Sequence, residues 1–292
     1  MDAPKLSICI PTWNSAHFLR DSIGSALREA VGDYEIVVVD NASEDDTAAV
    51  VASLNNGRIR YFRNEQNYGP HHSANRCLME ARGEYVKFLC ADDVFTEGVV
   101  AKQLEVLDRH PNVTLTTCNL CMTDSELHPE GVYRCFPGLH SGKRMVNVCL
   151  SGLGNYIGGP SALMYRRQDA LDITPGTAYK WVADLRHGLK LLEKGDYYNI
   201  DAVGYLYRRH ANTDTALNCP AGIRVPEYVR LVDEFDWWNP LNCAQALRHD
   251  HGGSVSREAV AQRWLRACAP QRVANAACAF NDVRFMRVYG KL

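Results

Sequence analysis

The 292-residue sequence has no run of about 18 consecutive apolar residues, which a membrane-spanning helix requires. It also has no excess of either charge, since 32 Lys and Arg are balanced by 34 Asp and Glu for a formal net charge of -2. A dedicated nucleic-acid-binding protein would carry a strongly basic face. The N-terminus lacks the basic start and long apolar stretch of a secretory signal. We therefore expect a soluble, cytoplasmic protein that binds no nucleic acid.

Cysteine is present, but not in the pattern of a disulfide framework. Eleven cysteines, an odd number, are spread from Cys9 to Cys278, which indicates thiols in a reducing compartment. The sequence shows no internal repeat and no low-complexity segment. With 46% hydrophobic residues, the chain has ample material for a packed core. Its length predicts about two domains, or one large α/β domain with an appendage.

Short apolar runs alternate with amphipathic segments in the first 121 residues. The apolar runs predict strands at 6–11, 34–40, 58–63, 84–90 and 113–121. The segments between them predict helices at 16–30, 45–54, 71–81 and 96–109. Alternation of this kind is typical of βαβ units, so we expect an α/β fold with an open, mostly parallel sheet flanked by helices.

The alternation breaks after about residue 122. The predicted elements there are a hairpin around 131–136, a Gly-rich loop at 151–161 that leads into a strand at 161–167, a helix at 182–194, and strands at 196–200 and 203–209. From about residue 222 to the end, the strand signal vanishes and the pattern predicts helices.

Polar residues follow three of the predicted strands directly. Trp13 follows the first strand, Asp40 ends the second, and Asp92 and Asp93 follow the fourth. Ligands of open α/β sheets bind at the carboxyl ends of the strands. An indole can stack on a base, a carboxylate can accept the imide N–H of uracil, and two acids can hold a divalent cation. Each residue alone could instead serve as a core cap or a turn former, but together they predict a nucleotide and metal site.

Five segments in this order resemble the inverting family 2 glycosyltransferases of the GT-A fold: LSICIPTWN, VVVDNASEDDT, NYGPHHSAN, GEYVKFLCADD and ADLRHGLKLLEKGDYYNIDAVGYLYRRH. The resemblance covers roughly residues 5–212. It implies a Rossmann-like GT-A catalytic domain over residues 1–215, with a nucleotide-sugar-binding half at 1–122 and an acceptor half at 123–215. Residues 216–292 would then be a helical C-terminal extension.

The resemblance also implies roles for individual positions. The residues implied to bind the nucleotide sugar are Pro11, Thr12, Trp13, Asp40, Gly69, Asn75, Ala91, Asp92 and His210. Asp92, Asp93 and His210 are implied to hold Mn²⁺ or Mg²⁺ against the donor diphosphate. The first acid of the family's Asp-x-Asp motif is replaced here by Cys90, and a neutral thiol is a poor ligand for a hard cation. Metal affinity would then depend on Asp92 as the direct ligand, with Asp93 next to it but not bound to the metal.

Asp184 matches the acid that serves as catalytic base in the family. Inverting transfer needs one carboxylate to take the proton of the acceptor hydroxyl. A later acid of the family segment is replaced by Arg186, so the match is partial. The alternative interpretation of Asp184 is an ordinary exposed acid near a helix start.

The tail from residue 255 carries seven basic and two acidic residues, with an apolar stripe at helical spacing that includes Val260, Trp264 and Cys268. One interpretation is peripheral contact with an anionic membrane surface, beside a lipid-linked acceptor. The favoured one is an amphipathic helix packed on the catalytic domain or on a second subunit, as in a homodimer.

These observations predict an inverting, metal-assisted glycosyltransferase. It would move a sugar from a nucleotide diphosphate donor, preferably UDP-linked, to a hydroxyl of a glycan or lipid-linked acceptor. By resemblance, the setting is bacterial surface polysaccharide synthesis in the cytoplasm or at the inner face of the membrane. Two alternatives are a nucleotidyltransferase that makes nucleotide sugars and a non-catalytic module that binds a nucleotide or a sugar. A nucleotidyltransferase requires a Gly-rich, basic loop after the first strand, and the segment PTWNSAHFLRDS is not such a loop.

Overall fold

The computed structural model describes residues 3–29, 32–152, 154–173, 176, 178–211, 213, 227–228 and 230–235. Strands and helices alternate through the first half, as the sequence predicts. These elements are β1 (Leu6–Thr12), α1 (Ala16–Arg28), β2 (Tyr34–Asp40), α2 (Thr47–Ser53), β3 (Ile59–Arg63), α3 (Pro70–Glu80), β4 (Tyr85–Phe88), β5 (Val94–Phe95), α4 (Val99–Arg109) and β6 (Val113–Thr123). Strand β5 was not predicted. Helix α4 starts later than expected because Gly98 precedes it in the left-handed region, with φ of 78°.

The second half contains short elements and one long strand. They are β7 (Pro129–Tyr133), β8 (Gly138–His140), α5 (Gly142–Gly152), the 3-10 turn η1 (Pro160–Ala162), β9 (Met164–Arg166), α6 (Arg167–Ala170), α7 (Ala183–Leu192) and β10 (Asp196–Arg208). The two strands predicted at 196–200 and 203–209 are one strand, β10, with register shifts around Val203. The strand predicted at 161–167 is reduced to β9, between η1 and α6.

Ten strands of the described chain form one sheet, in the order β3-β2-β1-β4-β9-β6-β10-β5, with β7 beside β6 and β8 beside β10. Strands β3, β2, β1 and β4 are parallel neighbours, and so are β6 and β10. Strand β9 runs antiparallel to both β4 and β6, so it joins the two parallel groups. The predicted open sheet with flanking helices is confirmed, and antiparallel pairings are concentrated in its second half.

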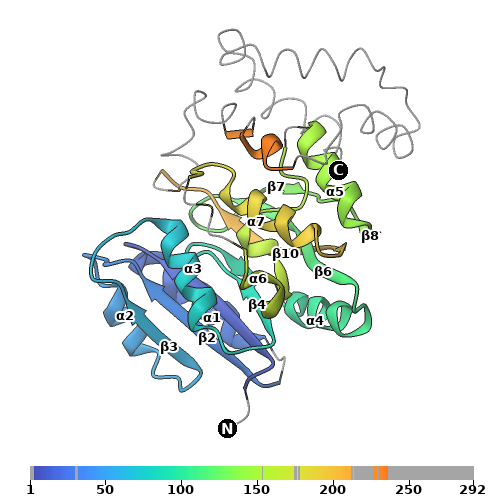
Figure 1. The fold of residues 1–292 in the computed structure, drawn as a ribbon. Coiled ribbons are helices and arrows are strands. Elements are labelled where there is room, and N and C mark those ends of the chain that lie inside the picture. The colour runs from blue at the N-terminus through green and yellow to red at the C-terminus, as the bar shows by residue number, and fades with distance from the viewer. Residues whose placement is uncertain are drawn as a thin grey trace.

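The core lies on both faces of the sheet, because side chains of a strand alternate between its faces. Ile8 of β1 and Val38 of β2 pack in the cluster that includes residues of α1 and α4. Cys9 and Val37 pack on the opposite face, in the cluster that includes residues of α3, α5 and α7. Figure 1 shows these helices on the two sides of the twisted sheet. All seven residues of β2 are buried, as expected for a strand covered on both faces.

The C-terminal helices predicted over 222–292 fall largely outside the described residues, and so does the apolar stripe at 260–268. Within that region, the described residues between 227 and 235 form a short helical segment that lies near α7 (Figure 1, orange). Every cysteine in the described ranges is a free thiol. Among the helices of the described ranges, none has the length and hydropathy needed to traverse a bilayer.

Candidate functional site at the carboxyl ends of the strands

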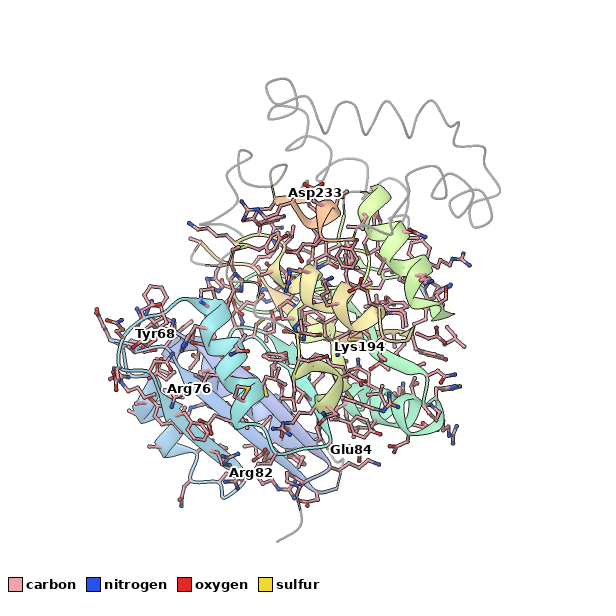
Figure 2. The ribbon with its side chains drawn as sticks, viewed as in Figure 1. Tyr68, Arg76, Arg82, Glu84, Lys194 and Asp233 are labelled. Carbon is pink, nitrogen blue, oxygen red and sulfur yellow. The ribbon has the colours of Figure 1, made fainter. Side chains whose placement is uncertain are left out.

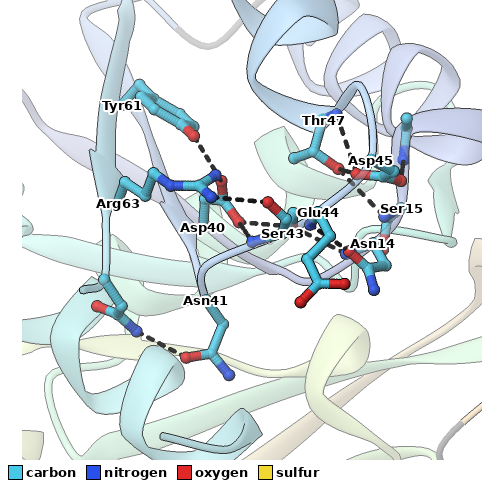
Figure 3. Close-up of polar contacts among 12 residues, drawn as sticks. Asn14, Ser15, Asp40, Asn41, Ser43, Glu44, Asp45, Thr47, Tyr61 and Arg63 are labelled. Atoms are coloured by element: carbon cyan, nitrogen blue, oxygen red, sulfur yellow. Dashed lines mark hydrogen bonds and ion pairs between the residues drawn. The ribbon is translucent and has the colours of Figure 1, made fainter. Parts of the chain in front are cut away.

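Asp40, the last residue of β2, is fully buried, and both of its carboxylate oxygens are bonded (Figure 3). Its Oδ1 accepts hydrogen bonds from the Ser43 amide at 2.8 Å and the Ser43 hydroxyl at 2.6 Å. Its Oδ2 accepts from the Tyr61 hydroxyl at 2.5 Å and from Arg63 at 2.6 Å. Burial, together with the bond to Asp40, raises the pKa of Tyr61 to about 12. A base edge can therefore bond to Asp40 only after one of these partners moves.

Pro11, Thr12 and Trp13 lie at the same edge as Asp40, because Thr12 and Asp40 are partners in the parallel ladder of β1 and β2. Thr12 is buried, and its Oγ1 has no hydrogen-bond partner among the described residues. The Trp13 side chain is 49% exposed. Because about half of the Trp13 side chain is exposed at this edge, its indole is available for stacking on a planar ligand.

Asn14 ties the loop after β1 to the loop after β2. The backbone amide of Asn14 donates to Ser43 Oγ at 2.8 Å, and its side-chain Oδ1 accepts from the backbone amide of Glu44 at 2.8 Å. The backbone of Asn14 has a φ of 47°, a left-handed conformation that asparagine tolerates better than most residues. Because Ser43 also bonds to Asp40, the two loops hold each other in place. Figure 3 shows this chain of contacts.

Asparagine side chains fasten the loop before α3 to the end of β2. Asn41 donates to Asn67 Oδ1 at 2.6 Å, and Asn64 donates to Asn41 Oδ1 at 2.8 Å. The amide of Gly69, which has a φ of 88°, donates to Asn67 Oδ1 at 2.8 Å. Sequence reasoning missed the asparagines, although their signal was present as an amide-rich loop between a strand and a helix.

Helix α3 packs against β1 and β2, so its first turns lie beside the strand ends. Gly69 precedes this helix, and the half-buried Asn75 lies within it. Tyr68 is 45% exposed, and its ring lies 4.6 Å from that of His72 at the start of α3. Figure 2 shows Tyr68 and Arg76 at this side of the molecule. The start of α3 thus adds an exposed aromatic ring to the same edge as Trp13.

A cluster of potential metal ligands follows β4. The Cys90 thiol and one carboxylate oxygen each of Asp92 and Asp93 lie within 4.8 Å of one another. Ala91 between them is buried. His210 Nε2 lies 3.1 Å from Asp92 Oδ2. The two carboxylates fit a hard divalent cation such as Mg²⁺ or Mn²⁺, while the thiol is a softer ligand than the acid that the motif has in the family.

Asp93 is held from two sides and is almost completely buried. The Ser161 hydroxyl donates to its Oδ2 at 2.5 Å, and the Arg208 amide donates to its Oδ1 at 3.3 Å. Burial and the neighbouring charge of Asp92 raise the pKa of Asp93 well above its usual range. Burial and the charges of Asp93 and Asp92 also raise the pKa of the Cys90 thiol. A cation at this cluster would offset the charge repulsion that adds to burial in both shifts.

Ser161, in η1, and Lys87, in β4, hold the cluster in place through hydrogen bonds. The sequence analysis predicted this role for neither residue. The Ser161 hydroxyl accepts from the Cys90 amide at 2.9 Å while it donates to Asp93. Its carbonyl accepts from Lys87 Nζ at 2.7 Å. Lys87 is fully buried, and burial lowers its pKa to about 8. The contact joins residues 74 positions apart, so no local pattern could reveal it.

Arg208 and His210, at the end of β10, bring the second half of the chain to the cluster. Arg208 Nε donates to the Asp92 carbonyl at 2.9 Å, and its NH2 group pairs with Asp21 at 3.0 Å. Its guanidinium lies 4.7 Å from the centre of the Phe18 ring, which in turn lies 4.6 Å from the His210 ring. Arg208 is buried and braces the cluster. Arg209 instead pairs with Glu130 at the surface.

Asp184 lies in the first turn of α7, on the second half of the chain. Asn155 Nδ2 lies 3.4 Å from Asp184 Oδ2 and donates to the Gly158 carbonyl at 2.9 Å. Asp184 is also among the charges that raise the pKa of the Cys90 thiol, after burial and the two cluster acids. The charge of Asp184 in α7 thus favours the neutral form of the Cys90 thiol after β4.

Asp92 shares the cluster with Cys90 and Asp93, and its Oδ2 lies 3.1 Å from His210 Nε2. Pro11, Thr12 and Trp13 lie at the end of β1, and the loop that contains Gly69 is bonded to Asn41 through Asn67. Asn75 lies within α3. Asp40 lies at the same edge, but its oxygens face Ser43, Tyr61 and Arg63 rather than an open pocket. The arrangement combines an exposed ring for stacking, an acidic cluster for a cation and a separate carboxylate on α7.

A family model described as glycosyl transferase family 2 matches residues 7–167, which is more than half of the chain. The chain belongs to glycosyl transferase family 2. The matched region contains β1 through β9, and so it includes the base pocket candidates, the acidic cluster and Ser161. It ends before α7 and β10, which carry Asp184 and His210.

Two curated relatives illustrate the similarity. An uncharacterised protein of Mycobacterium tuberculosis is 32% identical over 181 residues, 58% of this chain and 56% of its own length. A GalNAc(5)-diNAcBac-PP-undecaprenol beta-1,3-glucosyltransferase of Campylobacter jejuni is 41% identical over 106 residues, 35% of this chain and 34% of its own. The chain thus spans about half or less of the length of these relatives.

Two solved structures share the fold. TarS of S. aureus in complex with UDP-GlcNAc has a TM-score of 0.66 at 18% identity, covering 99% of this chain and 76% of the TarS chain. A mannosyltransferase of Pyrobaculum calidifontis in complex with GDP-Man and Mn²⁺ has a TM-score of 0.55 at 16% identity, covering 99% of this chain and 81% of its own. These likenesses establish the GT-A architecture.

Proposed function

We propose that this family 2 member is an inverting glycosyltransferase that uses a nucleotide diphosphate sugar, preferably a UDP-sugar. One observation carries the proposal. The Cys90, Asp92 and Asp93 cluster lies at the strand edge that also presents Trp13, and Asp184 provides a separate carboxylate in the first turn of α7. A donor diphosphate needs positive charge beside it, and the acceptor hydroxyl needs a base; the arrangement has a place for both.

The donor base stacks on Trp13, beside Thr12 and Pro11, in this proposal. Its pyrimidine edge reaches Asp40 Oδ2 only if Tyr61 or Arg63 releases that oxygen. The neutral Tyr61 is the partner that can leave at the lower cost, because Arg63 carries the charge that balances Asp40. Gly69, Asn75 and Ala91 border the nucleotide from α3 and from the loop after β4.

Asp92, Asp93 and His210 are the residues that would hold Mn²⁺ or Mg²⁺. A bound cation would stabilise negative charge on the departing diphosphate. The chain's own contribution is to keep Asp92 in place through Arg208 and His210. The nearby charge of Arg208 also favours the ionised form of Asp93.

Asp184 acts as the general base. As the acceptor oxygen bonds to the anomeric carbon, its proton moves to the Asp184 carboxylate. The bond between that carbon and the diphosphate oxygen breaks, and its electron pair leaves with the nucleotide diphosphate. Attack from the face opposite to the leaving group inverts an α-linked donor to a β-linked product.

A glycan or a lipid-linked sugar is the proposed acceptor, in surface polysaccharide synthesis at the inner face of the cell membrane. The Campylobacter jejuni relative supports this class, since it is a glucosyltransferase named for a glycan linked to undecaprenol through PP. In the same proposal, residues 1–215 form the catalytic unit and residues 216–292 an extension to it. Membrane contact by the extension and a homodimer belong to this proposal as well.

The test is calorimetric titration with UDP, with GDP, dTDP and CDP as controls, each with Mn²⁺ and with EDTA. We expect UDP to bind most tightly and Mn²⁺ to strengthen that binding. Asp184→Asn should then leave UDP affinity unchanged while sugar transfer falls by about 100- to 10,000-fold, the usual contribution of a general base. UDP binding without transfer in the unaltered protein would indicate a binding module. Absence of nucleotide binding would refute the proposal.

A further inference from the structure

The N-terminus of α7 lacks a capping residue of its own. The residue at its N-cap is Val182, whose side chain cannot accept a hydrogen bond. Backbone amides at a helix start have no partner within the helix, and their partial positive charges attract an anion. Asp184 stands only two residues further along, so the orientation of this helix end determines where its carboxylate lies.

Glu227, far along the chain, instead binds the backbone amides that lead into α7. Its Oε1 accepts a hydrogen bond from the Lys180 amide at 2.7 Å, and its Oε2 accepts from the amides of Trp181 at 2.7 Å and Val182 at 3.1 Å. The residue is only 7% exposed. Three successive amides thus converge on one buried carboxylate, which also places a negative charge at the positive end of α7.

The rest of this segment, between residues 227 and 235, is anchored to the same region. Glu234 pairs with Arg186 at 2.6 Å and accepts from the Tyr179 hydroxyl at 2.6 Å. Leu231 and Phe235 are buried in the cluster that contains residues of α5 and α7. Figure 2 locates the segment through Asp233, at the outer side of α7. Since these contacts fix its backbone, Glu227 is a rigid support rather than a mobile surface acid.

We propose that Glu227 is a positioning residue for sugar transfer, which holds the start of α7 and thereby sets the place of Asp184. The proposal rests on the role of Asp184 as general base. Loss of the Glu227 carboxylate would free three amides and let the helix end shift. A reacting group displaced by about 1 Å can cost about 100-fold in rate, even when substrate binding is unaffected.

Glu227→Gln is the sharpest probe, because glutamine keeps the size of the side chain but has one acceptor oxygen and an NH₂ group that would face amide donors. Glu234→Gln is the matched control, since it removes a carboxylate of the same segment without touching the amides before α7. The readout is UDP release from UDP-glucose, UDP-galactose, UDP-GlcNAc and UDP-GalNAc with water as the acceptor. Calorimetric UDP affinity and the thermal unfolding midpoint are measured on the same full-length proteins.

We expect Glu227→Gln to lower kcat by about 10- to 100-fold, with the donor KM and the UDP affinity within about twofold of the unaltered protein. Glu234→Gln should lower kcat less than threefold at a similar loss of thermal stability, because it breaks a partly buried ion pair with Arg186. Equal kcat losses in the two variants, or a donor KM that rises in step, would overturn the proposal. If Glu227→Gln does not fold, Glu227→Asp and Glu234→Asp replace the pair, with the same ordering expected.

Asp184→Asn separates this inference from the proposed function. If Asp184→Asn loses UDP release and Glu227→Gln keeps it, only the positioning role of Glu227 fails. If Asp184→Asn retains UDP release, the base assignment fails and the inference fails with it. If the unaltered protein releases UDP from none of the four donors, the proposed use of a UDP-sugar is contradicted along with the inference.

Discussion

Cys90 determines the chemical character of the acidic cluster. The resemblance to the family implies a carboxylate at its position, and its sulfur lies within 4.8 Å of carboxylate oxygens of Asp92 and Asp93. Hard cations prefer oxygen ligands, whereas a thiol becomes a good ligand only as the thiolate. Burial and the two acids raise the pKa of this thiol, so at neutral pH it remains protonated. The cluster would therefore offer Mg²⁺ or Mn²⁺ the carboxylates of Asp92 and Asp93, and a neutral thiol at position 90.

Cys90→Asp should strengthen binding of Mn²⁺ in the presence of UDP by about tenfold, or about 1.4 kcal/mol, because it adds an anionic oxygen to the cluster. The measurement is calorimetric titration of Mn²⁺ into the protein with saturating UDP. Cys90→Ser, which adds a neutral oxygen of similar size, should stay within about twofold of the unaltered protein. Equal Mn²⁺ affinities for the Asp and Ser variants would show that position 90 does not contact the cation.

Asp40 shows how a residue that is predicted to bind a ligand can be used by the fold itself. Its two oxygens accept bonds from Ser43, Tyr61 and Arg63, which together join the ends of β2 and β3. An unpaired buried carboxylate would be costly, so these partners stabilise the strand ends in the unliganded protein. A base that binds here exchanges one hydrogen bond for another. Arg63 carries the charge that balances Asp40 and also donates to the Ser43 carbonyl, so the neutral Tyr61 is the partner that can leave at the lower cost.

At the level of elements, the sheet edge depends on how closely β4 approaches β1. Gly83, just before β4, lies against β1 and donates its amide to Ser7 Oγ at 2.8 Å. A Cβ atom at this position would lie 2.5 Å from the Ser7 amide nitrogen and 2.6 Å from the Leu6 carbonyl carbon. Both contacts are with backbone, which cannot rotate away as a side chain can. Only glycine allows β4 to deliver Cys90 and Asp92 to the same edge as Trp13.

Gly83→Ala should therefore lower the free energy of unfolding by roughly 2 to 4 kcal/mol, as expected for steric overlap in a core. Urea unfolding followed by circular dichroism measures this loss. Gly57→Ala is the matched control, because nothing lies within 4 Å of a Cβ built there, and it should stay within about 0.5 kcal/mol of the unaltered protein. Equal stability of the two variants would contradict the close approach of the strands.

At the level of the whole molecule, the described segment beyond residue 226 belongs to the same core as the sheet. Leu231 is fully buried in the cluster that also contains Val37 of β2 and Leu189 of α7. Elements that share one core unfold together in a cooperative transition. We expect residues 227–235 to unfold with the sheet rather than as an independent appendage.

Leu231→Ala should lower the free energy of unfolding by about 2 to 5 kcal/mol, the usual cost of truncating a buried leucine. Differential scanning calorimetry should show the main transition shifted to lower temperature. Leu139→Ala, at a side chain that is 53% exposed, is the matched control and should shift it little. A main transition that stays in place while a separate, smaller one moves would show that the segment folds independently.

The sequence predicted the local elements and the family well because their signals are short in range. Strand β2 is an unbroken apolar run, and α1 places Leu19, Ile23 and Ala26 at helical spacing. The motif residues after β1 and β4 could be assigned to one sheet edge, since parallel strands end on the same side. Strand β5 was missed, and β9 was predicted to be longer than it is. Strands of two or three residues are fixed by their neighbours rather than by periodicity.

By itself, the amino-acid sequence determined the fold class, the strand-end placement of Trp13, Asp40 and Asp92, and the free state of the described cysteines. Only the tertiary structure decided which polar groups meet across the sheet. Lys87 reaches the Ser161 carbonyl over 74 positions, and Glu227 reaches the Trp181 amide over 46. Such contacts depend on how distant elements pack, and a hydrogen bond between them leaves no periodic trace in the chain. The tertiary fold thus anchors the residues that lead into α7.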